Sequence, residues 1–467
     1  MLTKAIKLTL ILLLIFTPIA FGSMELWAFS LMELGILFMI ILWAIQNLFR
    51  NSEFGIRNLK YEILFLSLFL IFIILQMIPL PSEVIKIFSP KTYALRHSLT
   101  VTTPHSAFRI PHLAISFVPF ATQIEFFKWL TLIGFFLFLM DWRSLGGKYR
   151  TTNHLLVVIL LMGVFESLYG MIEFFSGHRH ILHIDGTFMI SSATGTFINR
   201  NYFAGYLLMI IPLSIGFLWS REAIQTGQSG GWRHRLSSLD GKVLLIAFGI
   251  IVMILGLLFS ASRMGILSLL LSFSLMSLLF KGSGRHGGGS KILFLIFGLA
   301  LLWAAWIGLD AVISSFFSAS ENFKTRWMIW VNTFQILKDF PLFGSGLGTF
   351  GQIFPMYRTF HMLGLVTHAE NDFLQLASEV GLIGFGLLLT LFLYIFLKAI
   401  SRIRLLPNWE PQRYIGIGGL IGILALMFHS MVERNLQIPS NAFLYTLILA
   451  IVLRTSHKSL KPMIEEN

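Results

Sequence analysis

The polar residues that could carry out chemistry gather in one part of an otherwise apolar chain. Residues 313–372 hold Arg326 and end in a short run that contains His368, Glu370 and Asn371. A carboxylate or an imidazole can take a proton from a hydroxyl group, so Glu370 and His368 are both candidates for a general base. A cap at the start of the helix that follows would also explain an acidic cluster here. The residues alone leave the base and the cap as equal alternatives.

Two arginines are candidates for binding an anion. Arg263 lies within 260–265, a short turn between two apolar stretches, where a charge is costly and needs a partner. Small neighbours would let an anion approach its side chain, although contact with lipid headgroups is the alternative. Arg326 lies in the long polar stretch. The planar donors of a guanidinium match two phosphate oxygens at once, so the two arginines together could hold a diphosphate.

Other kinds of site find no support in the sequence. The chain has no cysteine, which excludes disulfides, thiolate metal ligands and cysteine nucleophiles. The histidines of residues 81–124 are not combined with carboxylates at metal-ligand spacing. The glycine-rich run at 344–351 lacks the Lys-Ser/Thr pair of a phosphate-binding loop and predicts a tight turn instead. We therefore expect no metal and no cofactor.

The elements that must position these side chains are apolar and helix-length. Hydrophobic residues make up 56% of the chain and charged residues 12%, which is not the composition of a soluble globular protein. A helix needs about 20 apolar residues to cross hydrocarbon, and about twelve stretches meet that criterion. We therefore predict an all-α, polytopic membrane protein that forms a single membrane domain over residues 1–467. The predicted spans are 6–22, 27–49, 61–80, 125–142, 154–176, 201–219, 243–259, 264–280, 292–312, 373–398, 414–433 and 439–454.

The basic residues predict which side of the membrane each loop occupies. With the N-terminus inside, most of the 35 lysines and arginines fall in the inner loops or near the two chain ends, where positive charge is favoured. Both termini are then cytoplasmic, and residues 313–372 form a large periplasmic loop. The basic residues are spread over many short loops rather than one face, so we expect membrane lipids but no nucleic acid as partners.

The large loop is expected to carry short interfacial helices. A capping pattern at 318–321 begins a stretch in which Phe323, Trp327, Trp330 and Phe334 recur at three- and four-residue steps. Such a helix presents one apolar face. Because tryptophan favours the boundary between membrane and water, we expect the helix to lie along that boundary.

Several of these stretches resemble the O-antigen ligase and O-antigen polymerase superfamily. The resemblance covers about residues 190–390, which would be the catalytic region and would include the loop at 313–372. The order and spacing of the stretches are more specific than any single one. They are Gly-Thr-Phe-Ile-Asn-Arg-Asn at 195–201, Ser-Ala-Ser-Arg-Met-Gly at 260–265, Arg-Trp-Met-Ile-Trp at 326–330, Asp-Phe-Pro-Leu-Phe-Gly-Ser-Gly-Leu-Gly at 339–348, and His-Ala-Glu-Asn-Asp at 368–372.

The resemblance implies an inverting, metal-independent glycosyltransferase at the periplasmic face of a bacterial inner membrane. Such an enzyme moves a glycan from undecaprenyl diphosphate to an acceptor hydroxyl. Ligases use lipid A-core as the acceptor, polymerases use another lipid-linked glycan, and related protein O-oligosaccharyltransferases use protein serine. A flippase or exporter of lipid-linked oligosaccharide is an alternative function, but it would need basic residues along a central cavity rather than at one face.

The resemblance also assigns roles to particular residues. Arg263 and Arg326 take the places of the family's diphosphate-binding arginines. Glu370 occupies the position of the family's base, directly before Asn371, whereas His368 lies two residues earlier. We therefore expect Glu370 to be the base and His368 to orient it or the acceptor. The substrate groove is expected to include Asn199, Arg200, Asn201 and Asn371.

Overall fold

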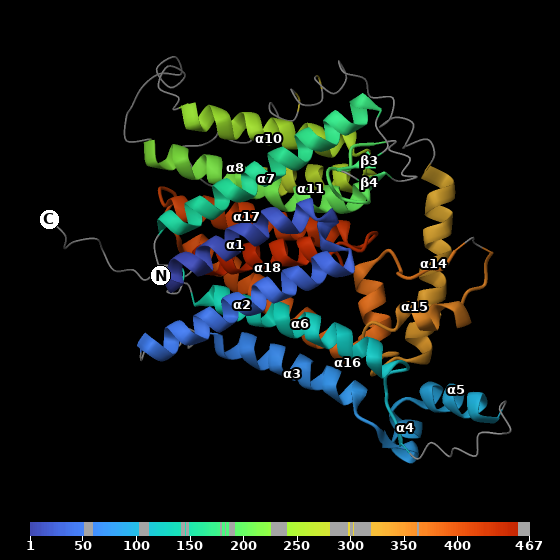
Figure 1. Ribbon diagram of the computed structural model, residues 1–467. Coiled ribbons are helices and arrows are strands. Elements are labelled where there is room, and N and C mark those ends of the chain that lie inside the picture. Colours follow the sequence, from blue (N-terminus) through green and yellow to red (C-terminus); the bar gives the residue numbers. More distant parts are fainter. Residues whose placement is uncertain are drawn as a thin grey trace.

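Apolar helices make up most of the structure (Figure 1). The computed structural model describes the chain apart from residues 51–58, 102–111, 142–144, 146–148, 178–179, 183, 186–191, 226–240, 281–297, 299–301, 303–318, 362–363 and 456–467. Within the described part, nine helices are long and apolar enough to cross a membrane, which confirms an all-α, polytopic membrane protein. They are α1 (Leu2–Ile19), α2 (Leu26–Arg50), α3 (Lys60–Met77), α6 (Pro119–Met140), α7 (Tyr149–Ser176), α8 (Arg200–Gln225), α10 (Gly241–Phe259), α16 (Asp372–Leu405) and α17 (Pro411–His429).

Two further apolar helices are shorter, namely α11 (Arg263–Phe280) and α18 (Pro439–Thr455). The nine longer helices and these two each correspond to one of the predicted spans. The remaining predicted span, 292–312, lies almost wholly outside the described residues. The length of the apolar stretches alone therefore predicted the apolar helices that lie within the described residues.

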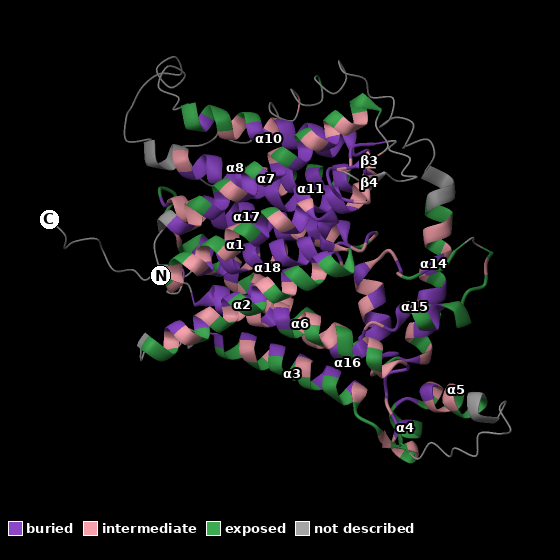
Figure 2. Cartoon of the chain, viewed as in Figure 1, coloured by how far each residue is buried: buried purple, intermediate pink, exposed green. Residues whose placement is uncertain are grey.

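The helices α8 and α17 form the centre of the bundle because glycines let their backbones approach closely. A Cβ atom on Gly216 of α8 would lie only 2.4 Å from the carbonyl oxygen of Tyr414. One on Gly422 of α17 would lie 2.6 Å from the carbonyl oxygen of Met209. Small residues have this role at helix contacts within membranes. The apolar part of α8 is buried throughout (Figure 2), so the start of α8 and the loop after α17 are held rigidly at one end of the bundle.

The helix α14 (Ala319–Asp339) runs across that end of the bundle, at the right of Figure 1. It confirms the helix predicted within the long loop, and it packs against α16. Phe323, Trp327 and Phe334 are exposed on it, so its apolar face is left uncovered by the rest of the described chain. An uncovered apolar face agrees with the placement that we expect for it at a membrane boundary.

Short elements complete the described structure. Two small antiparallel sheets pair Leu80 with Leu113 and His180 with Asp185. The short elements are η1 (Phe21–Ser23), β1 (Leu80–Pro81), α4 (Ser82–Phe88), α5 (Pro90–Val101), β2 (His112–Leu113), β3 (His180–Ile181), β4 (Ile184–Asp185), α15 (Phe350–Ile353) and η4 (Phe354–Met356).

The helix α16 is broken at Gly381, and a turn from the long loop fills the break. Gly381 has a φ of 63° and a ψ of −174°, so the helical hydrogen bonds are interrupted there. Residues 341–346 supply replacements, since the Ser345 N–H donates to the Ser378 carbonyl at 3.0 Å. A backbone group inside a membrane protein needs such a partner because no water is available to it.

Two glycines allow the turn to enter the break. A Cβ atom on Gly344 would lie 2.2 Å from the carbonyl oxygen of Glu379, and one on Gly381 would lie 2.3 Å from that of Leu342. The side chain of Gln76 on α3 closes the arrangement by donating to the Phe343 carbonyl at 2.7 Å. The glycine-rich run thus forms the predicted turn, and its close packing fixes the N-terminal part of α16.

Candidate functional site

A buried carboxylate organises the charged site at the end of the bundle. Glu433, in the loop between α17 and α18, is 3% exposed, and its Oε1 lies 2.5 Å from Nη1 of Arg326 on α14. Asn201 on the first turn of α8 donates to the same oxygen at 2.6 Å. Burial raises the pKa of Glu433, and the adjacent Arg326 opposes that rise. The pair joins α14, α8 and the 430–438 loop at one point.

Two more arginines approach this point. Arg200 begins α8 and Arg263 begins α11. Arg263, Arg326 and Glu433 are all close enough to Arg200 to interact with it electrostatically. The side chains of Arg200 and Arg263 make no hydrogen bond or ion pair with another described residue. Guanidinium groups that converge in this way are suited to binding an anion.

The loop before α8 is built to hold its polar residues in place. The Glu166 carboxylate accepts hydrogen bonds from both the backbone N–H and the hydroxyl of Thr196, at 2.8 and 2.9 Å. Asn199 then caps the start of α8, where its Oδ1 accepts from the Asn201 N–H at 2.8 Å. Asn199 and Asn201 therefore hold the start of α8 in place, with Arg200 between them.

Glu370 lies beside a fourth arginine. Its Oε1 is 3.6 Å from Nε of Arg434, and its side chain is 26% exposed. Arg434 also donates to the hydroxyl of Tyr202 on α8. Glu370 has a φ of 50°, a left-handed conformation that costs a non-glycine residue about 1–2 kcal/mol. Trp330 holds the preceding peptide by donating to the Ala369 carbonyl at 3.0 Å. Strain of this kind is often stored at functional sites.

His368 faces a different part of the molecule from Glu370. Its Nδ1 lies 3.4 Å from Nε2 of Gln375, and its ring lines a cavity beside α16. Burial, assisted by the charge of Arg434, lowers the pKa of His368 to about 3. The imidazole is therefore neutral under ordinary conditions. The two candidate bases are two residues apart in sequence but do not share a setting.

The capping role that competed with catalysis belongs to Asn371. Its Oδ1 accepts from the Leu374 N–H at 3.0 Å, so Asn371 is the N-cap of α16. Asp372 instead ties the helix to the 430–438 loop, because its Oδ2 accepts from the Leu436 N–H at 2.9 Å. Glu370 makes neither contact. The structure therefore places the cap at Asn371 and leaves the Glu370 carboxylate available beside Arg434.

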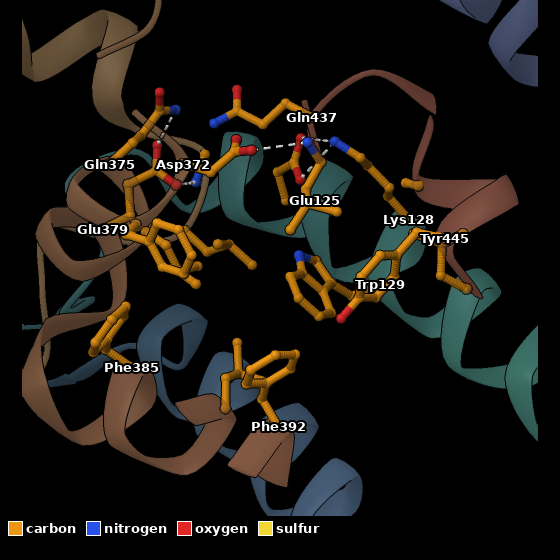
Figure 3. Close-up of a pocket in the computed structure, with 18 of the residues that line it drawn as sticks. Glu125, Lys128, Trp129, Asp372, Gln375, Glu379, Phe385, Phe392, Gln437 and Tyr445 are labelled. Carbon is orange, nitrogen blue, oxygen red and sulfur yellow. Dashed lines mark hydrogen bonds and ion pairs between the residues drawn. The ribbon is translucent and has the colours of Figure 1, made fainter. Parts of the chain in front are cut away.

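A cavity of about 350 Å³ opens on the other side of residues 367–368. It lies between α16 and the helices α3, α6 and α18. Polar side chains gather at one end, and apolar side chains, several of them aromatic, line most of the rest (Figure 3). Its charged, histidine and amide side chains are Glu125, Lys128, His368, Asp372, Gln375, Glu379 and Gln437.

The sequence prediction did not include Glu433 and Arg434. Both fall at the end of an apolar stretch that was assigned to a span at 414–433, so they were taken for its boundary. The signal that could have found them is an adjacent pair of opposite charges between two apolar stretches, because charge at that depth is costly without a function or a partner. Among the described residues, no group of three or more His, Cys, Asp or Glu could hold a metal ion.

The fold and this site define a multi-pass α-helical membrane protein with a charged, arginine-rich site at one end of its bundle. A sequence model of the family described as O-antigen ligase matches residues 248–389. The matched region contains Arg263, Arg326 and Glu370, and it supports the predicted resemblance to the O-antigen ligase and polymerase superfamily. No curated protein matches the chain. The assignment supports a ligase- or glycosyltransferase-type enzyme that acts on a lipid-linked glycan and an acceptor.

Proposed function

We propose that this protein transfers a glycan from undecaprenyl diphosphate to an acceptor hydroxyl at the periplasmic face of a bacterial inner membrane. The observation that carries the proposal is the convergence of Arg200, Arg263, Arg326 and Arg434 around Glu370 and Glu433. A diphosphate is the part of such a donor that needs several cations. The donor-binding role is assigned to Arg263 and Arg326, with Arg200 as a third contact.

The proposed reaction is a single displacement. The acceptor oxygen attacks the anomeric carbon, and the bond from that carbon to the diphosphate oxygen breaks. Undecaprenyl diphosphate leaves with the bonding electrons, and the arginines stabilise the negative charge that develops on it. Glu370 accepts the proton of the acceptor hydroxyl. Attack from the side opposite the leaving group inverts the anomeric centre, and no step requires a metal.

Geometry favours Glu370 over His368 as the base. Glu370 is beside Arg434 and close enough to Arg326 to interact with it electrostatically, so its carboxylate lies next to the arginines that would bind the donor diphosphate. His368 is turned toward the cavity. We assign it a role in placing the acceptor. The position of the charged cluster at one end of the bundle also favours transfer over transport by a flippase or exporter.

The proposed function is tested by removing the protein from its cell and sizing the glycans that remain on the lipid carrier. Loss of a ligase should leave long polymers on the carrier, because polymerisation continues while transfer stops. Loss of a polymerase should leave single repeats. A carrier-linked glycan distribution identical to that of the parent cell would refute the proposed transfer.

The orientation of the site can be tested directly because the chain has no cysteine. Ser98 on α5 is exposed at the site end, and Ser401 is exposed near the opposite end of α16. We expect Ser98→Cys to react with an impermeant thiol reagent added to the periplasm. Ser401→Cys should react only after the inner membrane is opened. The reverse labelling pattern would place the arginine site in the cytoplasm and contradict a periplasmic reaction.

A further inference from the structure

Two side chains from different helices hold the backbone of Ala369, the residue before Glu370. Trp330 on α14 donates its Nε1–H to the Ala369 carbonyl at 3.0 Å. Gln375 on α16 accepts from the Ala369 N–H through its Oε1 at 2.9 Å. Ala369 is fully buried, and a buried backbone group needs a partner of this kind. Because both partners are side chains, each contact can be removed by a single substitution.

The residues on both sides of Glu370 are fixed, which leaves Glu370 to take up the change in chain direction. Asn371 is the N-cap of α16, and the Asp372 N–H donates to the Ser430 carbonyl at 3.0 Å. Glu370 lies between these contacts and those of the preceding residue, and its φ is 50°. A residue other than glycine keeps such a backbone only where its surroundings hold it there. The side chain that results lies beside Arg434.

The contact from Gln375 is not part of the cap of α16. Ala369 lies two residues before the N-cap, so its N–H is not among the donors that the first turn of the helix leaves open. The other end of the Gln375 amide donates to Glu379, with 3.1 Å between Nε2 and Oε1 (Figure 3). Both side chains are buried. The contact with Glu379 therefore fixes which end of the amide faces Ala369.

Glu379 connects this contact to the glycine-rich run. Its Oε2 accepts from the Gly348 N–H at 2.9 Å, and its Oε1 accepts from the Phe350 N–H at 3.2 Å. A continuous series of hydrogen bonds thus runs from the glycine-rich run through Glu379 and Gln375 to the backbone of Ala369. The packing of the broken helix α16 therefore sets the position of the segment that carries Glu370.

The contact from Trp330 connects the same segment to the arginines. Trp330 and Arg326 are four residues apart on α14, so they lie on the same face of that helix. Arg326 reaches Glu433 at 2.5 Å, while Trp330 reaches Ala369. One helix therefore places both a proposed donor-binding arginine and the segment that carries the proposed base.

We infer that Trp330 and Gln375 are positioning residues, which hold the Ala369 backbone so that the side chain at position 370 faces Arg434. That this side chain acts as a base rests on the proposed function, whereas its direction does not. Trp330 and Gln375 act through the backbone of Ala369. Loss of either contact should turn residue 370 away from Arg434 without removing a charge from the site.

A thiol at position 370 can report its surroundings, because the chain has no cysteine. The groups that face this position are Arg434 and Glu433 of the loop after α17, Arg326 of α14 and Tyr202 of α8. Two arginines against one glutamate should keep the thiol pKa of Glu370→Cys below its usual value of about 8.5. The measurement is the alkylation rate against pH for the full chain in lipid nanodiscs. Arg434→Gln in the same background gives the thiol pKa without that arginine.

Two conservative variants test the positioning roles in this background. Trp330→Phe keeps an aromatic ring but loses the N–H, and Gln375→Met keeps the length of the side chain but loses the amide. Each should raise the thiol pKa by roughly 1, toward the value of Arg434→Gln. The matched controls are Trp327→Phe and Gln335→Met, which change exposed residues of α14. Both controls should keep the thiol pKa of the parent.

The same variants have a second readout when Glu370 is present. Trp330→Phe and Gln375→Met should lower kcat by about tenfold to a hundredfold, because a small misplacement of a catalytic group is costly. The KM for the donor should stay within about twofold, since the arginines are unchanged. The controls Trp327→Phe and Gln335→Met should keep both constants.

Two results would contradict the positioning roles. If Arg434→Gln raised the thiol pKa while Trp330→Phe and Gln375→Met left it at the parent value, neither residue would direct the side chain. If Arg434→Gln also left it unchanged, position 370 would not lie beside Arg434. Gln375→Met decides the question alone if Trp330→Phe is not monodisperse. The expected thiol pKa values in a protein that transfers no glycan would refute the proposed function and leave the positioning roles standing.

Discussion

Glu370→Gln is expected to abolish glycan transfer while donor binding survives. Glutamine keeps the size of the side chain and can still contact Arg434, but it cannot accept the proton of the acceptor hydroxyl. Loss of a general base typically slows a reaction by about 10²–10⁴-fold. The measurement is single-turnover transfer by the purified protein in proteoliposomes, with bound donor quantified in parallel.

His368→Gln provides the comparison, because His368 lies on the side of the same segment that faces the cavity beside α16. Burial lowers the pKa of His368 to about 3, so acidification from about pH 8 to pH 5 does not charge the imidazole. His368→Gln should retain measurable transfer and the same dependence of rate on pH over that range. The base would instead be His368 if Glu370→Gln were active, His368→Gln were inactive, and the transfer rate of the parent protein fell below about pH 6.5.

Arg263→Ala and Arg326→Lys are each expected to slow transfer by about tenfold to a hundredfold. A hydrogen bond to a charged group contributes about 1.5–3 kcal/mol, and each 1.36 kcal/mol corresponds to a factor of about ten in rate. The Arg263 side chain makes no hydrogen bond with another described residue, so we expect its loss to remove a ligand contact rather than a fold contact. Lysine at position 326 keeps the charge but cannot bind two phosphate oxygens in the plane of a guanidinium.

The control for these arginines is Lys324→Ala. Lys324 is an exposed cation on α14, two residues before Arg326, so its removal lowers the surface charge without touching Glu433. Transfer by Lys324→Ala should stay within about twofold of the parent, with all three variants expressed and monodisperse to the same degree. Normal transfer rates for both arginine variants would contradict diphosphate binding by Arg263 and Arg326. The two side chains would then only contact lipid headgroups.

The sequence was a good guide to the elements and a partial guide to the site. Membrane helices follow from apolar length alone, and α14 follows from the spacing of its aromatic residues. The directions of Glu370 and His368 could not be predicted, because they depend on the left-handed backbone at position 370. Glu433 was missed for a related reason, since its partner Arg326 is more than 100 residues away in the chain, and only folding brings the two together.

The break in α16 bears on how the protein is assembled in the membrane. A helix interrupted at Gly381 would enter the bilayer with exposed backbone groups, which hydrocarbon does not tolerate. The turn that completes it, residues 341–346, precedes α16 in the chain, and so does Gln76 on α3. Synthesis from the N-terminus therefore makes both partners before the break itself emerges. Because these segments are made first, α16 can pack against them as soon as it enters the membrane.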